Sequence, residues 1–235
     1  MRKIERSGAR GKSELGWLSS RFSYSFAEYL NPNRMNFGVL RVLNQDTIEA
    51  GAGFPLHHHE QMEIVTIMLA GVLTHQDSMG SKAELAVGEV QVMTAGTGIN
   101  HSEWNHGASQ VELLQIWMYP KKRALMPSYA QQRFEKSGRM NKLQLLVSGI
   151  QKEDALFIHQ DAAFLRASLD KGILVPYEVS NRSGGIFLFV ITGEVSVGSD
   201  TLSAGDSMEI SGEAAISIMA NTDADVLLIE VPMGL

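Results

Sequence analysis

The apolar residues of this chain come in short runs that turn-forming residues interrupt at regular intervals. Residues 64–70 form one run that stops at Gly71, and the next run stops at Asp77. Runs of about four to eight residues that are rich in Val and Ile, with such boundaries, are typical of antiparallel strands in a sandwich or barrel. Long amphipathic helices are scarce, so we predict an all-β chain. In the first half the runs cover residues 38–43, 64–70, 72–76, 90–94 and 111–118.

The length of the chain indicates two domains. At 235 residues it is long for one compact β domain, and a second strand-rich block runs over residues 143–231. Residues 192–195 resemble residues 70–73, and residues 203–206 resemble residues 86–89. These pairs indicate an internal duplication, although ordinary β-turn chemistry would also account for so short a likeness.

The boundary between the two domains is predicted near residue 135. Residues 124–136 are the best candidate for a helical or irregular linker, because Pro120 and Pro127 bracket its start. We therefore expect an N-terminal domain over residues 1–135 and a C-terminal domain over residues 136–235.

The composition excludes several classes of protein. The chain has no cysteine, so disulfides, thiolate zinc sites and cysteine nucleophiles are excluded. Its net charge is −6 and its 20 Lys and Arg residues are scattered, whereas sequence-independent binding to nucleic acid needs a basic face. Gly and Ser interrupt the basic N-terminus and no apolar stretch follows it, so we do not expect it to be a signal peptide. The apolar runs are too short to span a bilayer. We expect a soluble, cytoplasmic protein that binds neither nucleic acid nor membranes.

Two short segments carry side chains that could hold a metal ion. Successive side chains of a strand point to opposite faces, so His57 and His59 share one face and His58 takes the other. The same rule places His101 and Glu103 together. If both pairs point inward, three imidazoles and a carboxylate meet, a set that suits Fe, Mn, Ni, Cu or Zn better than Ca or Mg.

The context of the second pair strengthens this hypothesis. A histidine-rich turn by itself is often only part of the surface. However, the glycine-rich residues 96–100 lead directly into His101 and Glu103. A buried Glu103 without a cation would cost several kcal/mol. A further histidine, His75, lies at a predicted strand end and could line the mouth of the pocket.

At these residues the chain resembles the cupins, and among them the pirins. Residues 93–103 are similar to the pirin signature, and residues 16–26 resemble bacterial pirin-type bicupins. Thr94 replaces the usual proline of the second cupin motif, and two extra residues separate Gly96 from His101. The residues that match the two cupin motifs are Gly51, His57, His59, Glu63 and Gly71 for the first, and Gly88, Gly96, His101 and Asn105 for the second.

The resemblance implies a bicupin, that is, two antiparallel β-barrel domains of the double-stranded β-helix or jelly-roll type. It also implies one divalent metal ion, with Fe(II) favoured and Mn, Ni, Cu or Zn as alternatives. The implied ligands are His57, His59, His101 and Glu103. In other cupins Glu63 would be the carboxylate ligand, and spacing alone leaves that choice open. The pirin pattern prefers Glu103 and leaves Glu63 to orient a ligand histidine.

The C-terminal half offers no second site of this kind. Residues 160–235 contain no histidine. Counting from the repeated glycines places Val179, Asn181 and Ile218 where His57, His59 and His101 stand. We expect this domain to lack metal ligands.

The pirin resemblance also implies an activity, the 2,3-dioxygenation of a flavonol such as quercetin. O₂ would open the flavonol ring with release of carbon monoxide, and Glu103 would act as general base for the 3-hydroxyl group. Phe54, Trp104 and Trp117 could face the flat substrate or simply pack the barrel. The alternatives are a non-catalytic, metal-binding regulator with a protein partner, and another cupin activity on a small sugar or keto acid.

Overall fold

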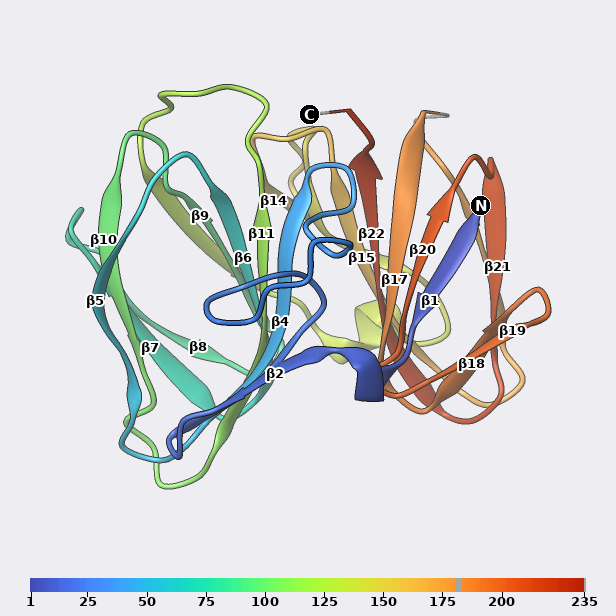
Figure 1. Cartoon of the computed structure of the whole chain (residues 1–235), viewed down its shortest axis with the longest axis horizontal. Helices are drawn as coiled ribbons and strands as arrows, with labels where there is room; N and C mark the ends of the chain where they lie inside the picture. Colours follow the sequence, from blue (N-terminus) through green and yellow to red (C-terminus); the bar gives the residue numbers. More distant parts are fainter. Residues whose placement is uncertain (181–182, 235) are drawn as a thin grey trace.

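Two β-sandwiches lie side by side in the computed structural model, which describes every residue except 181, 182 and 235 (Figure 1). Each sandwich combines a seven-stranded sheet with a four-stranded sheet. The described strands pair in antiparallel fashion, apart from the short parallel pair of β13 and β14. The prediction of an all-β chain with two strand-rich units is confirmed. No helix in the described part of the chain is long and apolar enough to cross a membrane.

The first sandwich contains strands β2 to β12. Its large sheet has the order β12 (Ser128–Arg133), β9 (Glu89–Thr94), β6 (Glu63–Ala70), β11 (Val111–Met118), β4 (Leu40–Ile48), β3 (Leu18–Phe22) and β2 (Gly11–Glu14). Its small sheet has the order β5 (Gly53–His59), β10 (Ile99–Trp104), β7 (Val72–Asp77) and β8 (Lys82–Ala86).

The second sandwich repeats this order of strands. Its large sheet has the order β1 (Arg2–Glu5), β20 (Ser207–Ser211), β17 (Gly184–Thr192), β22 (Ala224–Pro232), β15 (Ala163–Leu169), β13 (Gln144–Ser148) and β14 (Leu156–Phe157). Its small sheet has the order β16 (Leu174–Glu178), β21 (Ala215–Ala220), β18 (Glu194–Val197) and β19 (Asp200–Ser203). The four-stranded sheets correspond strand for strand, which agrees with an internal duplication.

The sheets do not close into barrels, and the expectation of closed barrels is wrong in this respect. The edge strands β2 and β5 form no ladder across the gap between the two sheets of the first sandwich. A jelly roll is stable as two packed sheets, because side chains between the sheets bury the inner faces whether or not the edges join. The units are therefore cupin-like sandwiches.

The N-terminal strand belongs to the other half of the molecule. β1 pairs with β20 over four residues, from Arg2 opposite Ile210 to Glu5 opposite Ser207. The chain then passes through a short 3₁₀ helix, η1 (Ser7–Ala9), before β2 begins in the first sandwich (Figure 1). Residues 2–5 thus belong to the large sheet of the second sandwich, although they precede the first sandwich in the sequence. The predicted domain boundary after residue 135 stays a prediction.

The expected linker over residues 124–136 is mostly a strand. β12 pairs with β9 from Ser128 opposite Thr94 to Arg133 opposite Glu89. Its tyrosine, Tyr129, stacks on the buried ring of His75 with a centroid distance of 4.6 Å. The prolines before it end the preceding strand, but they do not prevent a new edge strand from starting. A second 3₁₀ helix, η2 (Lys136–Arg139), follows.

The apolar core is distributed unequally between the two sandwiches and the layer that joins them. The largest cluster lies between the two large sheets and takes residues from both sandwiches, among them Leu43, Ile116, Phe187 and Leu227. The second sandwich has a continuous apolar interior of its own. In the first sandwich the interior is split into two small clusters, around Leu73 and around Met93. The polar side chains described next occupy the interior of this sandwich.

Candidate metal centre

The candidate ligands come from two neighbouring strands of the small sheet. β10 lies between β5 and β7, with His101 opposite His57 on one side and opposite Asp77 on the other. The register between β10 and β5 shifts after His101, so that Glu103 faces Phe54 rather than Pro55. Such a bulge re-aims side chains locally.

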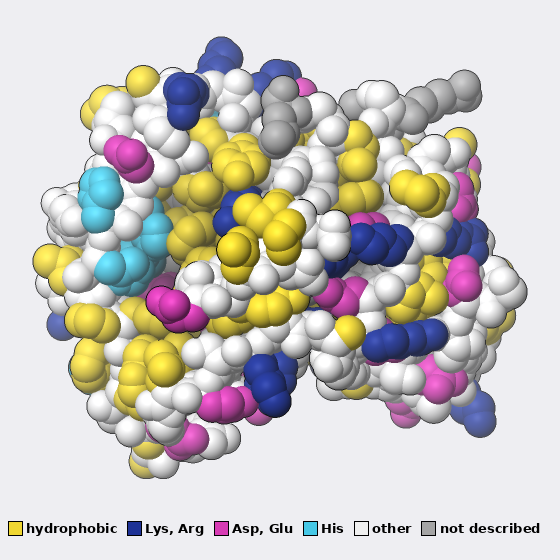
Figure 2. Space-filling view, viewed as in Figure 1, with side chains coloured by type: hydrophobic (Ala, Val, Ile, Leu, Met, Phe, Trp, Pro, Cys, Tyr) yellow, Lys and Arg dark blue, Asp and Glu magenta, His cyan; other side chains and the backbone are white. Residues whose placement is uncertain are grey.

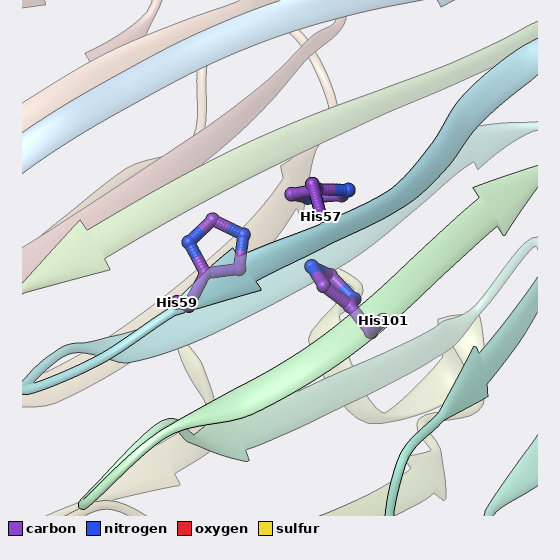
Figure 3. Close-up of side chains that lie close together, drawn as sticks. All are labelled: His57, His59 and His101. Atoms are coloured by element: carbon purple, nitrogen blue, oxygen red, sulfur yellow. The ribbon is translucent and has the colours of Figure 1, made fainter.

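Three imidazoles face one another across these strands (Figure 3). The ring centroids are 4.4 Å apart for His57 and His101, 4.7 Å for His57 and His59, and 4.9 Å for His59 and His101. Their potential ligand atoms all lie within 4.8 Å of one another. His58 is exposed on the other face and contacts Asn100, as strand parity predicts.

Glu103 lies on the buried side of this group. One of its ligand atoms is within 4.8 Å of those of His101 and His75, so His101 belongs to both groups. Gln115 donates a hydrogen bond from Nε2 to Glu103 Oε2 over 2.9 Å. The other carboxylate oxygen, Oε1, is buried and has no hydrogen-bond partner among the described residues. The structure therefore groups His57 and His59 with His101, and places Glu103 in a second group with His101 and His75. A single site made of all four residues stays a prediction.

Burial favours the neutral form of His59 and His101 and disfavours the charged form of Glu103. Burial, together with the neighbouring imidazoles, lowers the pKa of His59 to about 4 and that of His101 to about 2. Burial raises the pKa of Glu103 to about 7, and the hydrogen bond from Gln115 opposes part of this rise. Neutral imidazoles keep a lone pair for a cation, and a cation would in turn stabilise the carboxylate.

The donor atoms that are present fit a divalent transition metal ion. His101 Nε2 and Glu103 Oε1 are buried without partners, which is costly unless something binds them. His57 Nδ1 lies 2.8 Å from the carbonyl oxygen of Pro55. Because a carbonyl only accepts, Nδ1 carries the proton and His57 Nε2 keeps its lone pair. Imidazole nitrogens with one carboxylate are the ligands that such ions prefer.

A cavity of about 230 Å³ opens in front of these residues. Figure 2 shows histidine side chains beside a hollow with hydrophobic side chains on its wall. Phe54 and Trp117 line the cavity as predicted, whereas Trp104 is not among its lining residues and packs near His106 instead. The remaining apolar lining consists of Leu15, Leu18, Phe22, Phe26 and Ala27, and the polar lining of Ser13, Ser20, Asn44, Asp46, His57, His59, Glu103 and Gln115.

Two expectations about neighbouring residues are wrong. His75 is completely buried behind His101 rather than at the mouth of the pocket. Glu63 does not orient a histidine ring, because its Oε2 accepts from the hydroxyl of Thr94 at 3.0 Å and from the backbone N–H of His159 at 3.2 Å. Thr94, at the place of the usual cupin proline, thus supplies a donor for a buried carboxyl group.

Sequence reasoning gave Gln115 no role at the site. It lies on β11, in the sheet opposite the ligands, and nothing in its local sequence points to a role at the site. Its one sequence signal is its position as a polar residue between Leu114 and Ile116, where a buried amide would need a partner.

Strand register locates the corresponding positions in the second sandwich. Ile216 pairs with Tyr177 as His101 pairs with His57, and Ile218 pairs with Val197 as Glu103 pairs with His75. The place of His57 thus holds Tyr177, not Val179, and the place of His101 holds Ile216, not Ile218. Asn181, counted from the sequence as the counterpart of His59, lies outside the described residues. Within the described residues, both groups of candidate metal ligands lie in the first sandwich. That the C-terminal domain lacks metal ligands stays a prediction.

Comparison with known proteins gives the same family as the motifs. Residues 3–118 match the family model described as pirin, and residues 145–231 match that of the quercetinase C-terminal cupin domain. A pirin-like protein of Caulobacter vibrioides is 40% identical over 221 residues, which cover 94% of this chain and 95% of that protein. The chain belongs to the pirin family.

Among other pirin relatives, a protein of Escherichia coli strain K12 named quercetin 2,3-dioxygenase is 39% identical over 230 residues. The match covers 97% of this chain and 98% of that protein. The crystal structure of the bacterial pirin YhhW from Escherichia coli, in complex with nickel(II), superposes with a TM-score of 0.93. It is 39% identical, and the match covers 99% of both chains. The bicupin fold of this pirin is therefore confirmed.

Proposed function

We propose that this pirin is a metal-dependent flavonol dioxygenase, of the quercetin 2,3-dioxygenase type. The observation that carries the proposal is that His57, His59 and Glu103 line a cavity with aromatic walls, while His101 is grouped with the two histidines and also with Glu103. The name of the Escherichia coli relative gives the substrate class. The substrates would be a flavonol and O₂, and the location the cytoplasm, which the absence of cysteine fits.

In this proposal the four side chains hold one divalent ion, and Fe(II) is the ion that we favour. When bound, the ion supplies Lewis-acid activation and a template for the flavonol 3-hydroxyl and 4-oxo groups. Nickel(II) in the related pirin structure supports a divalent ion of this series, without fixing which one serves here.

The residues of the chain supply proton transfer and orientation. The proton of the flavonol 3-hydroxyl moves to Glu103 Oε1, the carboxylate oxygen that has no hydrogen-bond partner. Gln115 holds the other oxygen in place during this step. Phe54 and Trp117 contact the flat faces of the substrate and exclude water from it.

The overall reaction consumes one O₂ for each carbon monoxide released. Two carbon–carbon bonds of the central ring break, carbon 3 leaves as CO with its own oxygen, and both atoms of O₂ remain in the ring-opened ester. The balance needs no further oxidant or reductant.

The test is turnover of quercetin by purified protein that is reconstituted separately with Fe(II), Mn(II), Ni(II), Cu(II) and Zn(II). We expect a metal-dependent loss of the flavonol absorbance with release of carbon monoxide. Absence of turnover with the ion demonstrably bound would reject the dioxygenase and favour the alternative, a metal-binding regulator with a protein partner. The matched control is His58→Ala, which alters the same histidine run on its exposed face.

A further inference from the structure

Two buried residues behind His101 form a chain of contacts that ends at its ring. His75 is fully buried on β7, and its Nδ1 lies 3.4 Å from Nδ1 of His101. On the other side of the ring, His75 Nε2 lies 3.2 Å from Oδ2 of Asp77. Tyr129 stacks on the His75 ring with an interplanar angle of 27°, so the ring is held between β12 and β10. Neither His75 nor Asp77 lines the cavity.

The position of each proton in this chain follows from the Asp77 carboxylate. Its Oδ1 accepts the backbone N–H groups of Met79 at 2.9 Å and Ser81 at 3.0 Å, which fixes the carboxylate and leaves Oδ2 to His75. A carboxylate only accepts, so His75 Nε2 carries a proton. A neutral imidazole has one N–H, and His75 Nδ1 is therefore an acceptor.

The same reasoning then applies to the next ring. His101 Nδ1 must donate to His75 Nδ1, so a neutral His101 has its lone pair on Nε2. That atom is buried without a partner in the structure. The chain of contacts thus presents a lone pair from the one imidazole that both groups of candidate ligands share.

We propose that His75 and Asp77 are positioning residues of the metal centre, which fix His101 in the tautomer that offers Nε2 to the ion. In many metal sites a ligand histidine donates its second N–H directly to a carboxylate or a carbonyl group. Here a second imidazole stands between the ligand and the carboxylate. The inference rests on the metal site of the proposed function, but not on the flavonol reaction.

Asp77→Asn is the most informative substitution, because it changes hydrogen-bonding character with little change in shape. The amide oxygen stays with the N–H groups of Met79 and Ser81, so the NH₂ group faces His75 Nε2. His75 must then accept at Nε2 and donate from Nδ1. His101 Nδ1 becomes the acceptor, and the proton of His101 moves to Nε2, where it blocks the ion.

The first experiment measures the histidine tautomers by ¹⁵N NMR of the metal-free, full-length protein labelled at histidine. We expect His101 to carry its proton on Nδ1 in the wild-type protein and on Nε2 in Asp77→Asn. A wild-type His101 protonated on Nε2 overturns the inference. This readout requires neither metal nor turnover, so it fails or succeeds independently of the dioxygenase proposal.

The second experiment measures Ni(II) affinity by competition with a chelator. We expect Asp77→Asn to bind Ni(II) roughly 10- to 100-fold more weakly than the wild-type protein. His75→Leu should show a similar loss, whereas His75→Asn, which can place an amide oxygen near the position of Nδ1, should recover most of the affinity. Wild-type affinity in both Asp77→Asn and His75→Leu overturns the inference. If the wild-type protein itself binds no Ni(II), the proposed metal site fails and the inference fails with it.

The control is Asp200→Asn, a change of the same type in the second sandwich, where the carboxylate forms an ion pair with Arg2. It should leave Ni(II) affinity and the His101 tautomer unchanged. If Asp77→Asn does not fold, the inference is still tested by the His101 tautomer of the wild-type protein and by the Ni(II) affinities of His75→Leu and His75→Asn.

Discussion

Gln115 on the large sheet donates a hydrogen bond from Nε2 to Oε2 of Glu103 on the small sheet, over 2.9 Å. The same glutamine accepts at Oε1 from Thr66 at 3.3 Å, and Thr66 Oγ1 accepts from Gln91 at 3.4 Å. A row of buried polar side chains across three strands of the large sheet thus holds the one carboxylate among the candidate ligands. This row leaves Glu103 Oε1 as the oxygen without a partner.

Gln115→Met tests this support, because methionine keeps the length of the side chain and removes the donor. We expect the metal-free protein to lose about 1–3 kcal/mol of unfolding free energy, since Glu103 loses its donor in a buried place. Metal affinity should fall roughly tenfold, because the carboxylate is no longer oriented. Chemical denaturation and chelator competition measure the two effects. Gln110→Met, at an exposed glutamine bonded to Glu49, is the control. Unchanged affinity in Gln115→Met would show that Glu103 needs no support from the large sheet.

His101→Ala separates the site from the scaffold. We expect it to abolish stoichiometric metal binding, because His101 belongs to both groups of candidate ligands. The stability of the metal-free protein should fall only modestly, because the loss of a buried nitrogen without a partner offsets part of the lost contact with His75. Metal analysis after dialysis and thermal denaturation check the two points. His58→Ala should match the wild-type protein in both, and a metal content of one ion per chain in His101→Ala would contradict the ligand assignment.

The local part of the site could be predicted from the sequence, but its support could not. His57 and His59, like His101 and Glu103, are two residues apart in a strand, and period-two geometry fixes their common face. His75 reaches the site through the pairing of β7 with β10, and Gln115 reaches it through the packing of the large sheet against the small one. Spacing carries no information on such register, and only the assembled sheets place these side chains behind the ligands.

The duplication was visible in the sequence, but its register was not. Three residues separate β5 from β6, whereas five separate β16 from β17. Counting back from Gly193 by the spacing of the first half therefore stops two residues short and finds Val179 in place of Tyr177. Edge strands were equally hard to predict: β1 is paired with residues about 200 positions away, and β12 lies in a segment that reads as a linker.

Trp117→Phe tests the wall of the cavity. The indole Nε1 is buried without a hydrogen-bond partner, and the ring packs edge-on against His59 with a centroid distance of 4.8 Å. A flavonol oxygen within reach of Nε1 would gain about 1 kcal/mol. We expect the KM for quercetin to rise about fivefold in Trp117→Phe, with the metal content unchanged. Trp104→Phe, outside the cavity, should leave the KM as it is. An equal KM in both variants would mean that Trp117 only packs.

Glu63→Gln tests the pH dependence of stability. Burial raises the pKa of Glu63 to about 7, against bonds from His159 N–H and the Thr94 hydroxyl that lower it. Because the folded pKa lies above the ordinary value of a glutamate, the folded state binds more protons between these two values. The stabilising protonation is complete below about pH 4.5 and is lost as the pH rises through about 7.

Over this pH range the protein loses about 3 kcal/mol of unfolding free energy through Glu63, at 1.36 kcal/mol per pKa unit. Glutamine keeps an oxygen for both donors and carries no charge, so Glu63→Gln should be more stable than the wild-type protein at pH 9. At pH 5 the two should differ little. Urea denaturation of the metal-free proteins at both pH values gives the comparison. Asp46 and Glu103, whose pKa values burial also raises, are common to both proteins and cancel. A stability difference that is the same at both pH values would show that Glu63 does not titrate in this range.

Phe187→Ala tests whether the two sandwiches unfold as one unit. Phe187 is fully buried in the cluster between the two large sheets, and its ring centroid is 6.0 Å from that of Tyr24, in the segment between β3 and β4. We expect a loss of about 3–5 kcal/mol, which is the usual cost of removing a buried phenylalanine ring.

Because this core is shared, the loss should reach the sandwich that does not contain Phe187. The three tryptophans of the chain, Trp17, Trp104 and Trp117, all lie in the first sandwich, so their fluorescence reports its unfolding alone. Amide exchange on β17 reports the second sandwich. In the wild-type protein and in Phe187→Ala the two probes should give the same midpoint in denaturant, displaced together by the substitution. Phe157→Ala, at a partly exposed ring on β14, should displace neither by much. If the exchange midpoint falls while the tryptophan midpoint stays, the apolar layer between the large sheets does not couple the unfolding of the two sandwiches. The stability of the metal centre then depends on the first sandwich alone.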